Sequence, residues 1–500
     1  MFRSIFTFSF FTVISRISGL ARDILIAIII GATPSADVFF FSFRFVNLFR
    51  AFFAESGGFT VSFISLYSAE LCNNARKAFS FASSAISFTF IISLVLCLIT
   101  YILYPFMIKI LAPRFNQSES VLTISLSRIM MPYIIFISIS SLIGGMLQVK
   151  QHHFTSTAIA PVILNLFLII SLFMPYVKTP VYNLSTAFLV GGIFQLLLML
   201  FSAYKLKAAF SIKFELNNDT KLFFKYAIPV IINNCITQIR ILIDTIMASL
   251  VPNAVFYIYY ADRLNQLPQG VIGTAIGTVL LPLISKQIND IKTVIKIQSE
   301  AFILGLILIM PIIAAFVIIP DKILLTLFSY GKFDYCTVQQ ISPVLIALSF
   351  SLPAYILNKA LLPTFFANGN FKMPTIFSLV SLGANAMLNI LLMHKFQHIG
   401  IAISTSISTW INSILLINYL IINKMYKISQ VLLLHIVKVL ISTLIMSTFL
   451  YFCSSLLPVL FFDTAFDRII HLAALILLSI IIYFSMLYLT FMGNYKCIKV

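Results

Sequence analysis

Charged side chains inside two otherwise apolar segments near the N-terminus are the first residues whose types and spacing suggest chemistry. Residues 16–58 contain four basic and three acidic side chains, namely Arg16, Arg22, Asp23, Asp37, Arg44, Arg50 and Glu55. A charge near the centre of a bilayer costs about 3 kcal/mol or more, so these side chains are expected to face a bundle interior or a water-filled cavity. The excess of arginines over acids predicts a polar cavity that receives an anion.

The spacing of the arginines predicts how they line such a cavity. Arg16 and Arg22 are six residues apart, which on one helix separates them by about 9 Å along the axis and about 120° around it. Arg44 and Arg50 have the same spacing. Arginines placed in this way line neighbouring faces of one groove, and the guanidinium fork binds phosphate oxygens in pairs.

A less specific interpretation competes with the cavity for some of these residues. Charged side chains also snorkel to the membrane interface, or they lock helices together as ion pairs. For Arg44 and Asp23 both interpretations stay open, and Asp23 could hold the adjacent Arg22 by charge pairing. For four arginines we favour a position in the lining of the cavity, because a charged side chain buried in a membrane without a function costs free energy. These are Arg16, Arg22, Arg50 and Arg263.

The elements that must position these side chains are membrane-spanning helices. Hydrophobic residues make up 60% of the 500 residues, charged residues only 10%, and the mean hydropathy is +1.05. Soluble domains are about 25% charged, and a spanning helix needs about 20 mostly apolar residues. The composition therefore predicts an all-α polytopic membrane protein. The net charge of +18 comes mainly from lysines and arginines in short connections between the apolar runs. This placement is typical of the enrichment of basic residues in the cytoplasmic loops of membrane proteins and does not favour nucleic-acid binding.

Apolar runs predict about fourteen transmembrane helices. The second and eighth runs contain glycine and polar residues, so bent or broken helices are expected there. Boundaries of this kind carry an error of about two to four residues. The runs lie at 5–30, 36–69, 80–111, 121–148, 155–176, 183–205, 222–250, 254–285, 299–327, 338–367, 373–394, 399–423, 430–457 and 468–491.

The polar connection 206–221 divides the first six runs from the next six, and these two sets begin in a similar way. We therefore predict an N-terminal lobe at 1–207, a C-terminal lobe at 208–425, and two additional helices within 426–500. Transporters are often built from such repeats, with the site near the repeat interface. Most lysines and arginines of the connections lie on the side of the N-terminus, which predicts that both termini are cytoplasmic.

Motifs of enzymes and metal sites are missing from the sequence. There is no P-loop, no GxSxG, no HExxH and no paired-carboxylate motif. The six cysteines are scattered without paired spacing, which favours neither a disulfide framework nor a metal site. We therefore expect a transporter and not an enzyme, driven by an ion gradient, the membrane potential or the gradient of its substrate. Further basic residues inside apolar runs are Arg128, Arg240, Lys359 and Lys438, of which Arg128 could simply snorkel.

Four motifs resemble those of the MurJ (MviN) family of lipid II flippases, within the multidrug/oligosaccharidyl-lipid/polysaccharide (MOP) exporter superfamily. They are RISGLARD (16–23), PSADVFFFSFRFVNLFRAFFAE (34–55), YYADRLNQLPQGVIGTAIGTVLLPLIS (259–285) and FFANGNFKMP (365–374). The resemblance extends over essentially the whole chain. It implies two six-helix lobes around a central cationic cavity that opens alternately inward and outward, and a groove for the lipid tail formed by helices thirteen and fourteen.

The resemblance also implies the function and its residues. Lipid II, a polyprenyl-diphosphate-linked disaccharide peptide, would move from the inner to the outer leaflet of the bacterial inner membrane. Membrane lipids would surround the protein, and cell-wall synthases are further candidate partners. Arg16, Arg22, Arg50 and Arg263 would bind the diphosphate, and Asp37 matches the family's acid on the second helix. From their charge and position in the sequence, three further residues are expected to support the site or its gating together with Asp37: Asp23, Arg44 and Glu55. The alternative is a related exporter of drugs or of other polyprenyl-linked oligosaccharides.

Some members of this family bind sodium through an acid on helix seven and residues of helices eleven and twelve. Asp244, Asn385, Asn389, Ile401 and Thr405 match that spacing. Asn389 stands where the sodium-binding member has an acid, so a site here lacks one negative ligand. No other cofactor is implied. A further departure is Asn370 within 365–374, where the family usually has Asp.

Overall fold

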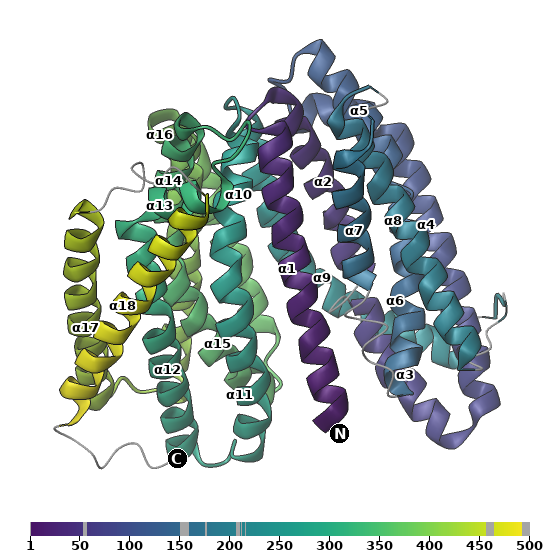
Figure 1. Cartoon of the computed structure of the whole chain (residues 1–500). Coiled ribbons are helices and arrows are strands. Elements are labelled where there is room, and N and C mark those ends of the chain that lie inside the picture. Colours follow the sequence, from purple (N-terminus) through teal and green to yellow (C-terminus); the bar gives the residue numbers. More distant parts are fainter. Residues whose placement is uncertain are drawn as a thin grey trace. The chain divides into compact units, whose positions relative to one another are not determined.

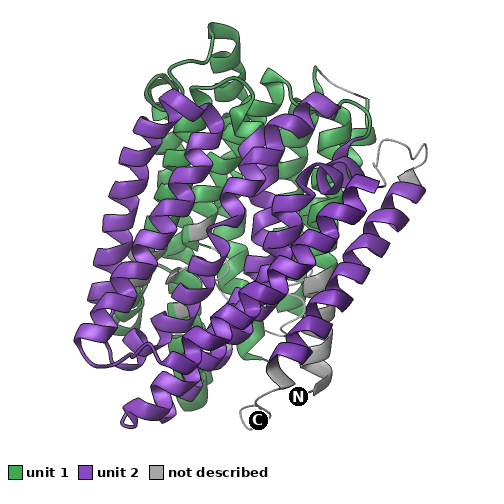
Figure 2. Ribbon diagram, turned by 90° about the vertical axis from the view of Figure 1, so that its left-hand side faces the viewer, with its two compact units in different colours: residues 1–256, 330–332 green, residues 257–329, 333–500 purple. Residues whose placement is uncertain are grey.

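The computed structural model describes residues 2–53, 58–150, 160–175, 178–206, 211, 213–215, 217–456 and 465–492. Over these ranges the chain is helical or in short turns, with no β-strand. The predicted all-α class is therefore confirmed. The chain forms two compact units, which Figure 2 shows in different colours. Unit 1 contains residues 1–256 and the short turn 330–332, and unit 2 contains residues 257–329 and 333–500.

Unit 1 is a bundle of helices in which segments distant in sequence lie side by side (Figure 1). Helix α7 packs against α1 and α8, α2 packs against α5 and α9, and α3 packs against α9. The helices are α1 (Phe2–Ile30), α2 (Pro34–Phe53), α3 (Gly58–Asn73), α4 (Ala75–Leu111), α5 (Gln117–Met130), α6 (Tyr133–Val149), α7 (Ala160–Phe173), α8 (Pro180–Lys205) and α9 (Asn218–Ser249).

Unit 2 begins within α10 and runs to the C-terminal helices. Helix α15 packs against α11, α12 and α16, and α17 packs against α12 and α18. The helices are α10 (Ala254–Pro268), the π-helix η2 (Gln269–Gly273), α11 (Thr274–Lys286), α12 (Ile291–Ile318), α13 (Pro320–Phe328), α14 (Tyr335–Ser349), α15 (Leu352–Ala367), α16 (Lys372–Ile422), α17 (Gln430–Leu456) and α18 (Ala465–Met492). Of these, α16 consists of two helices that meet at a kink at Gln397.

The predicted apolar runs coincide with helical residues, and the structure shows where proline divides them. In the eighth run, where a bent or broken helix is expected, α10 ends at Pro268 and a π-helical turn joins it directly to α11, so the helix is interrupted in type but not broken. The fourth run is also divided, between α5 and α6, where Pro132 lacks the N–H that a continuous helix needs. The tenth run is divided ahead of Pro353 in the same way. The count of fourteen spanning helices stays a prediction.

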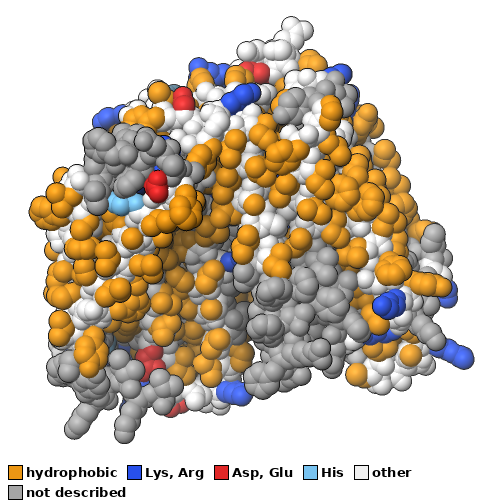
Figure 3. All heavy atoms as spheres, viewed as in Figure 1, with side chains coloured by type: hydrophobic (Ala, Val, Ile, Leu, Met, Phe, Trp, Pro, Cys, Tyr) orange, Lys and Arg blue, Asp and Glu red, His pale blue; other side chains and the backbone are white. Residues whose placement is uncertain are grey.

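The surface of the helices is suited to a membrane. In the described residues, nine helical segments are long and apolar enough to cross a bilayer, and Pro161–Phe173 is a shorter apolar helix. On the face that Figure 3 shows, hydrophobic side chains cover most of the flanks of the helices, and charged side chains lie mainly towards their ends. The chain is therefore a multi-pass membrane protein.

The predicted lobes rest on a sequence repeat and stay a prediction. By its contacts, α9 lies with the helices of unit 1, packed on α2, α3 and α4. A helix can pack against one lobe and still belong to the sequence repeat of the other lobe. The packing of α9 therefore does not test the predicted boundary between residues 207 and 208. Of the residues that the sequence analysis singled out, Glu55 lies outside the described residues.

Candidate functional site

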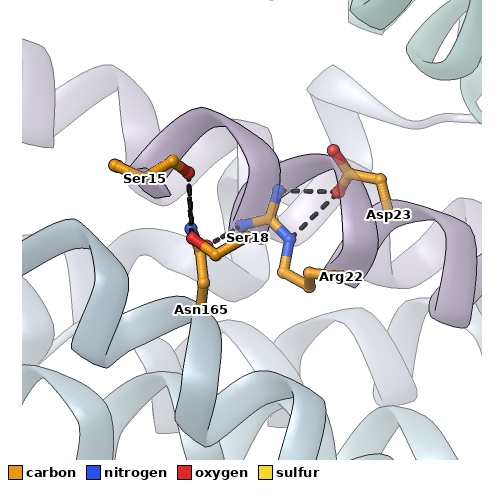
Figure 4. A network of polar contacts seen from close by, with 5 residues as sticks. All are labelled: Ser15, Ser18, Arg22, Asp23 and Asn165. Carbon is orange, nitrogen blue, oxygen red and sulfur yellow. Dashed lines mark hydrogen bonds and ion pairs between the residues drawn. The ribbon is translucent and has the colours of Figure 1, made fainter. Parts of the chain in front are cut away.

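The described part of unit 1 contains a buried arginine held by a carboxylate of its own helix. Arg22 and Asp23 lie side by side on α1, and their side chains are 8% and 0% exposed. The guanidinium donates from Nη2 and Nε to Asp23 Oδ1, at 2.7 and 3.0 Å (Figure 4). The charge pairing between Asp23 and the adjacent Arg22 that the sequence suggests is therefore present, within one helix. Its functional role stays a prediction.

Asn165 of α7 completes this network from a position 143 residues away in the sequence. Its Oδ1 accepts a hydrogen bond of 3.0 Å from Arg22 Nη1, and its Nδ2 donates to Ser18 Oγ at 3.0 Å and to the Ser15 carbonyl at 3.4 Å (Figure 4). One amide therefore accepts from the arginine and donates to α1. The sequence analysis missed this residue, although a lone asparagine in the run APVILNLFLII is a detectable signal.

The ring of Phe43 forms one wall of the Arg22 site. The guanidinium carbon lies 5.6 Å from the centre of this ring, which is within the range of a cation–π contact. Burying an ion pair costs several kcal/mol per ion unless further hydrogen bonds compensate, and Asn165 supplies such a bond. The arrangement keeps a permanent positive charge in a fixed orientation inside a membrane helix bundle.

Arg44 of α2 is half-buried and makes a contact between helices. Its Nη1 donates to Thr245 Oγ1 of α9 at 3.2 Å, and the Thr245 hydroxyl donates in turn to the Ile241 carbonyl at 2.7 Å. This contact connects α2 to α9 within unit 1. Because the acceptor is a neutral hydroxyl, the interpretation of Arg44 as part of an ion pair that locks helices stays a prediction.

Asp37 lies in the first turn of α2, where the helix dipole favours a negative charge. The side chain is 5% exposed, and its Oδ1 accepts a hydrogen bond of 2.8 Å from the backbone N–H of Phe256. Asp37 also lines a cavity of about 180 Å³ together with Arg114, Glu119 and Asn253. The acid therefore fastens the first turn of α10 to the beginning of α2.

The other predicted arginines occupy positions on three helices of the two units. Arg16 is exposed on α1, and Arg50 is half-buried in the last turn of α2. Arg263 is half-buried on α10 in unit 2, next to Asp262, which accepts a hydrogen bond of 2.7 Å from Gln266. Their convergence on one substrate stays a prediction.

Unit 2 contains a further cation that the sequence analysis noted without assigning a role. Lys359 of α15 is half-buried, with its Nζ 5.3 Å from the centre of the Tyr355 ring. Its stem lies near Gly277 of α11, and a Cβ at Gly273 would approach the Tyr355 ring to 2.3 Å. Glycine at position 273 therefore leaves space for the Tyr355 ring, which makes the cation–π contact with Lys359.

The predicted sodium ligands are distributed over both units. Asp244 lies on α9 in unit 1 and is 7% exposed. In unit 2, Asn385 and Asn389 are both 0% exposed, and Asn389 Nδ2 donates to Asn385 Oδ1 at 3.4 Å. Thr405 donates to the Ile401 carbonyl at 3.1 Å. These groups offer oxygen atoms but only one negative charge, and no cluster of three His, Cys, Asp or Glu occurs in the described part of the chain.

The C-terminal helices pack on α12 within unit 2. Tyr483 of α18 is fully buried, and its hydroxyl donates to the Ile307 carbonyl of α12 at 3.0 Å. Ala314 and Met446 are buried against the same tyrosine. The predicted groove for a lipid tail on these helices stays a prediction.

Comparison with known proteins gives consistent results over the whole chain. The family described as lipid II flippase MurJ matches residues 26–472. The probable lipid II flippase MurJ of Rickettsia prowazekii is 32% identical over 504 residues, covering 99% of this chain and 99% of that protein. The lipid II flippase MurJ of Burkholderia cenocepacia is 31% identical, covering 98% and 97% of the two chains.

Solved structures show the same fold. A lipid II flippase MurJ in an inward closed conformation matches with a TM-score of 0.83 and 25% identity, covering 98% of this chain and 99% of that chain. An inward-facing multidrug resistance transporter of the MATE family, in the MOP superfamily, matches with a TM-score of 0.68 and 15% identity, covering 82% and 95%. The second similarity concerns the fold alone.

Proposed function

This chain belongs to the MurJ family of lipid II flippases, and on that premise we propose that it moves lipid II from the inner to the outer leaflet of the bacterial cytoplasmic membrane by alternating access. The observation that carries the proposal is the family match over residues 26–472, together with relatives that align over nearly their full length. The protein acts as a transporter, without a catalytic step.

The chemistry of the arginines supports this substrate. Lipid II presents a diphosphate, and arginine binds such oxygens through paired hydrogen bonds while it stays charged. In the proposed cycle, the diphosphate neutralises Arg16, Arg22, Arg50 and Arg263, which lowers the repulsion between the lobes so that they close and reopen outward. The membrane potential or an ion then resets the carrier. Asp23 and Asn165 orient Arg22 for this role, and Asp37, through its bond to Phe256, contributes to gating.

Complementation tests the proposal in a bacterium depleted of its own lipid II flippase, with the accessibility of lipid II in the outer leaflet as the readout. Wild type is compared with Arg22→Ala, Arg50→Ala and Arg263→Ala, each checked for membrane expression. Arg76→Ala is the matched control, because Arg76 is an exposed arginine in the first turn of α4. We expect rescue by wild type and the control, and loss in the three variants.

The outcomes separate function from mechanism. Failure of a well-expressed wild type contradicts the flippase proposal. Rescue by all three arginine variants keeps the function and contradicts the role of the arginines.

A second candidate is a related exporter of drugs or of other polyprenyl-linked oligosaccharides. The observation in its favour is the fold shared with a MATE transporter of the MOP superfamily. An exporter of this kind would bind its own substrates without competition from lipid II analogues. The flippase is expected to show such competition, so a binding assay with a diphosphate-containing analogue distinguishes the two.

Further proposals concern location, partners and ions. We place the protein in the inner membrane with both termini cytoplasmic, from the distribution of basic residues. Cell-wall synthases, which consume lipid II, are candidate partners. If sodium binds, Asn385, Asn389 and Thr405 would supply neutral oxygen ligands and Asp244 the only negative charge, so we propose that sodium binds weakly.

A further inference from the structure

Arg128 is a membrane-embedded arginine outside the proposed lipid II site. It lies in the last turn of α5, within the span Gln117–Val149, and its guanidinium carbon is 4.6 Å from the centre of the Tyr101 ring on α4. Within the described ranges, no oxygen accepts a hydrogen bond from its guanidinium and no carboxylate forms an ion pair with it; its Nε is buried. A fork of five N–H donors is thus held in place without an acceptor.

Local structure explains part of this position. Pro132 removes the N–H that would bond to the Arg128 carbonyl, so α5 ends here, and a positive charge is favourable at a helix C-terminus. These effects account for a cation at this point. They do not account for a guanidinium whose donors reach none of the carbonyls at the break.

The arginine and the tyrosine lie at the apolar exterior of the bundle. Tyr101 is 44% exposed, and its exposed apolar neighbours include Leu98 and Ile102 on α4 and Val121 on α5. These two helices pack against each other within unit 1. The medium next to this surface is therefore lipid.

The pair lies between the midplane and the edge of the hydrocarbon layer, within reach of that edge for a long side chain. At 1.5 Å per residue, with each span centred on the bilayer, Arg128 lies about 7.5 Å and Tyr101 about 12 Å from the midplane. Side chains on a helix lean towards its N-terminus, so the guanidinium of α5 leans further outward. The hydrocarbon half-thickness is about 15 Å, which brings the fork close to the lipid phosphates on the side where α4 ends and α5 begins.

We propose that Arg128 and Tyr101 form a binding site for the phosphate of an anionic phospholipid in that leaflet. The guanidinium binds two phosphate oxygens, the Tyr101 hydroxyl donates to the headgroup, and the acyl chains lie on the apolar surface of α4. Charge complementarity argues for this occupant, because the site has an unused cation and an apolar approach. A soluble anion would have to leave water to reach Arg128, whereas a phospholipid already lies in the leaflet next to it.

The test is lipid binding to the full-length protein, purified in detergent and depleted of lipid. Native mass spectrometry is used to titrate phosphatidylglycerol and phosphatidylcholine, and inorganic phosphate is added as a competitor. Wild type is expected to prefer phosphatidylglycerol. Arg128→Gln should weaken this binding about tenfold, as expected for loss of hydrogen bonds to a charged group, and Tyr101→Phe should weaken it less.

The matched control is Lys178→Gln. Lys178 also lies beside an aromatic ring, with its Nζ 5.2 Å from the centre of Tyr182, but it precedes α8 and lies outside the span. This variant should bind phosphatidylglycerol as wild type does. Retention of phosphatidylcholine binding by Arg128→Gln shows that the variant is folded.

Two results would overturn the proposal. The first is unchanged affinity of Arg128→Gln for phosphatidylglycerol; if this variant is nevertheless defective in cells, the result would indicate a partner helix with a carboxylate in place of the lipid. The second is displacement of the lipid by inorganic phosphate at millimolar concentration, which would assign the site to a soluble anion.

Discussion

The buried guanidinium of Arg22 is oriented by three groups, which are the Asp23 carboxylate, the Asn165 amide and the Phe43 ring. Of these, only Asn165 joins α1 to α7 by hydrogen bonds. Its amide has no substitute of the same shape that both accepts and donates. Asn165 therefore links the Arg22 network on α1 to α7.

Replacement of Asn165 by leucine is expected to destabilise the protein. The change leaves Arg22 Nη1 without its acceptor in a buried site, which costs about 1.5–3 kcal/mol. Thermal unfolding in detergent should show a lower apparent melting temperature, and lipid II transport should fall. Leu166→Ala is the control, because Leu166 is 52% exposed on the same helix. Equal stability of Asn165→Leu and wild type would contradict the importance of this network.

A second prediction at this scale concerns the neutral pair Asn385 and Asn389. Both side chains are fully buried, so a carboxylate at position 389 would gain strongly from a bound cation. Asn389→Asp is therefore expected to show a sodium-dependent rise in melting temperature that exceeds the rise of wild type, with potassium as the reference salt. An equal response of both proteins to sodium and potassium would exclude a sodium site at these residues.

Among the elements, the corner between α1 and α2 interlocks with the turn 330–332. Gly31 and Gly331 have φ of +68° and +61°. A Cβ at Gly31 would lie 2.6 Å from the Lys332 carbonyl oxygen, and one at Gly331 would lie 2.5 Å from the Ile28 carbonyl oxygen. The Lys332 N–H donates to that same Ile28 carbonyl at 2.9 Å. Two backbone segments distant in sequence approach each other here, as only glycine permits.

Alanine at either glycine is expected to cost more than the strain of a positive φ. Gly369 provides the comparison, because it has φ of +70° and no atom within 4 Å of a Cβ built there. Gly369→Ala should cost about 1 kcal/mol, and Gly31→Ala and Gly331→Ala should cost clearly more, since backbone atoms must move. The measurement is the decrease in melting temperature of each of the three variants relative to wild type. Equal shifts would mean that the close approach is not tight.

For the whole molecule, the orientation of the chain in the membrane can be tested with its own cysteines. Cys72 is exposed near the end of α3, and Cys336 is exposed near the start of α14. The charge distribution places the first in the cytoplasm and the second on the opposite side. In single-cysteine variants within intact cells, a membrane-impermeant thiol reagent should label Cys336 and leave Cys72 unlabelled. The reverse pattern would invert the proposed topology.

The sequence by itself determined the class of the protein, the approximate positions of its helices and the charged residues of interest, although not Asn165. These properties are local or compositional. A spanning helix needs about 20 apolar residues in succession. A run that contains glycine and proline, such as 254–285, is interrupted at those residues. An arginine inside an apolar run costs free energy wherever it lies. The family resemblance rested on equally local motifs.

The tertiary structure alone decided which residues distant in sequence become partners. Arg22 meets Asn165 across 143 residues and Asp37 meets Phe256 across 219, Gly31 meets the turn at Gly331, and Arg128 lies against Tyr101 without an acceptor for its guanidinium in the described residues. A contact of this kind depends on which helix faces pack together, and the long apolar faces of these helices look alike in sequence. Packing selects one arrangement among them, because each buried polar group must find its partner there.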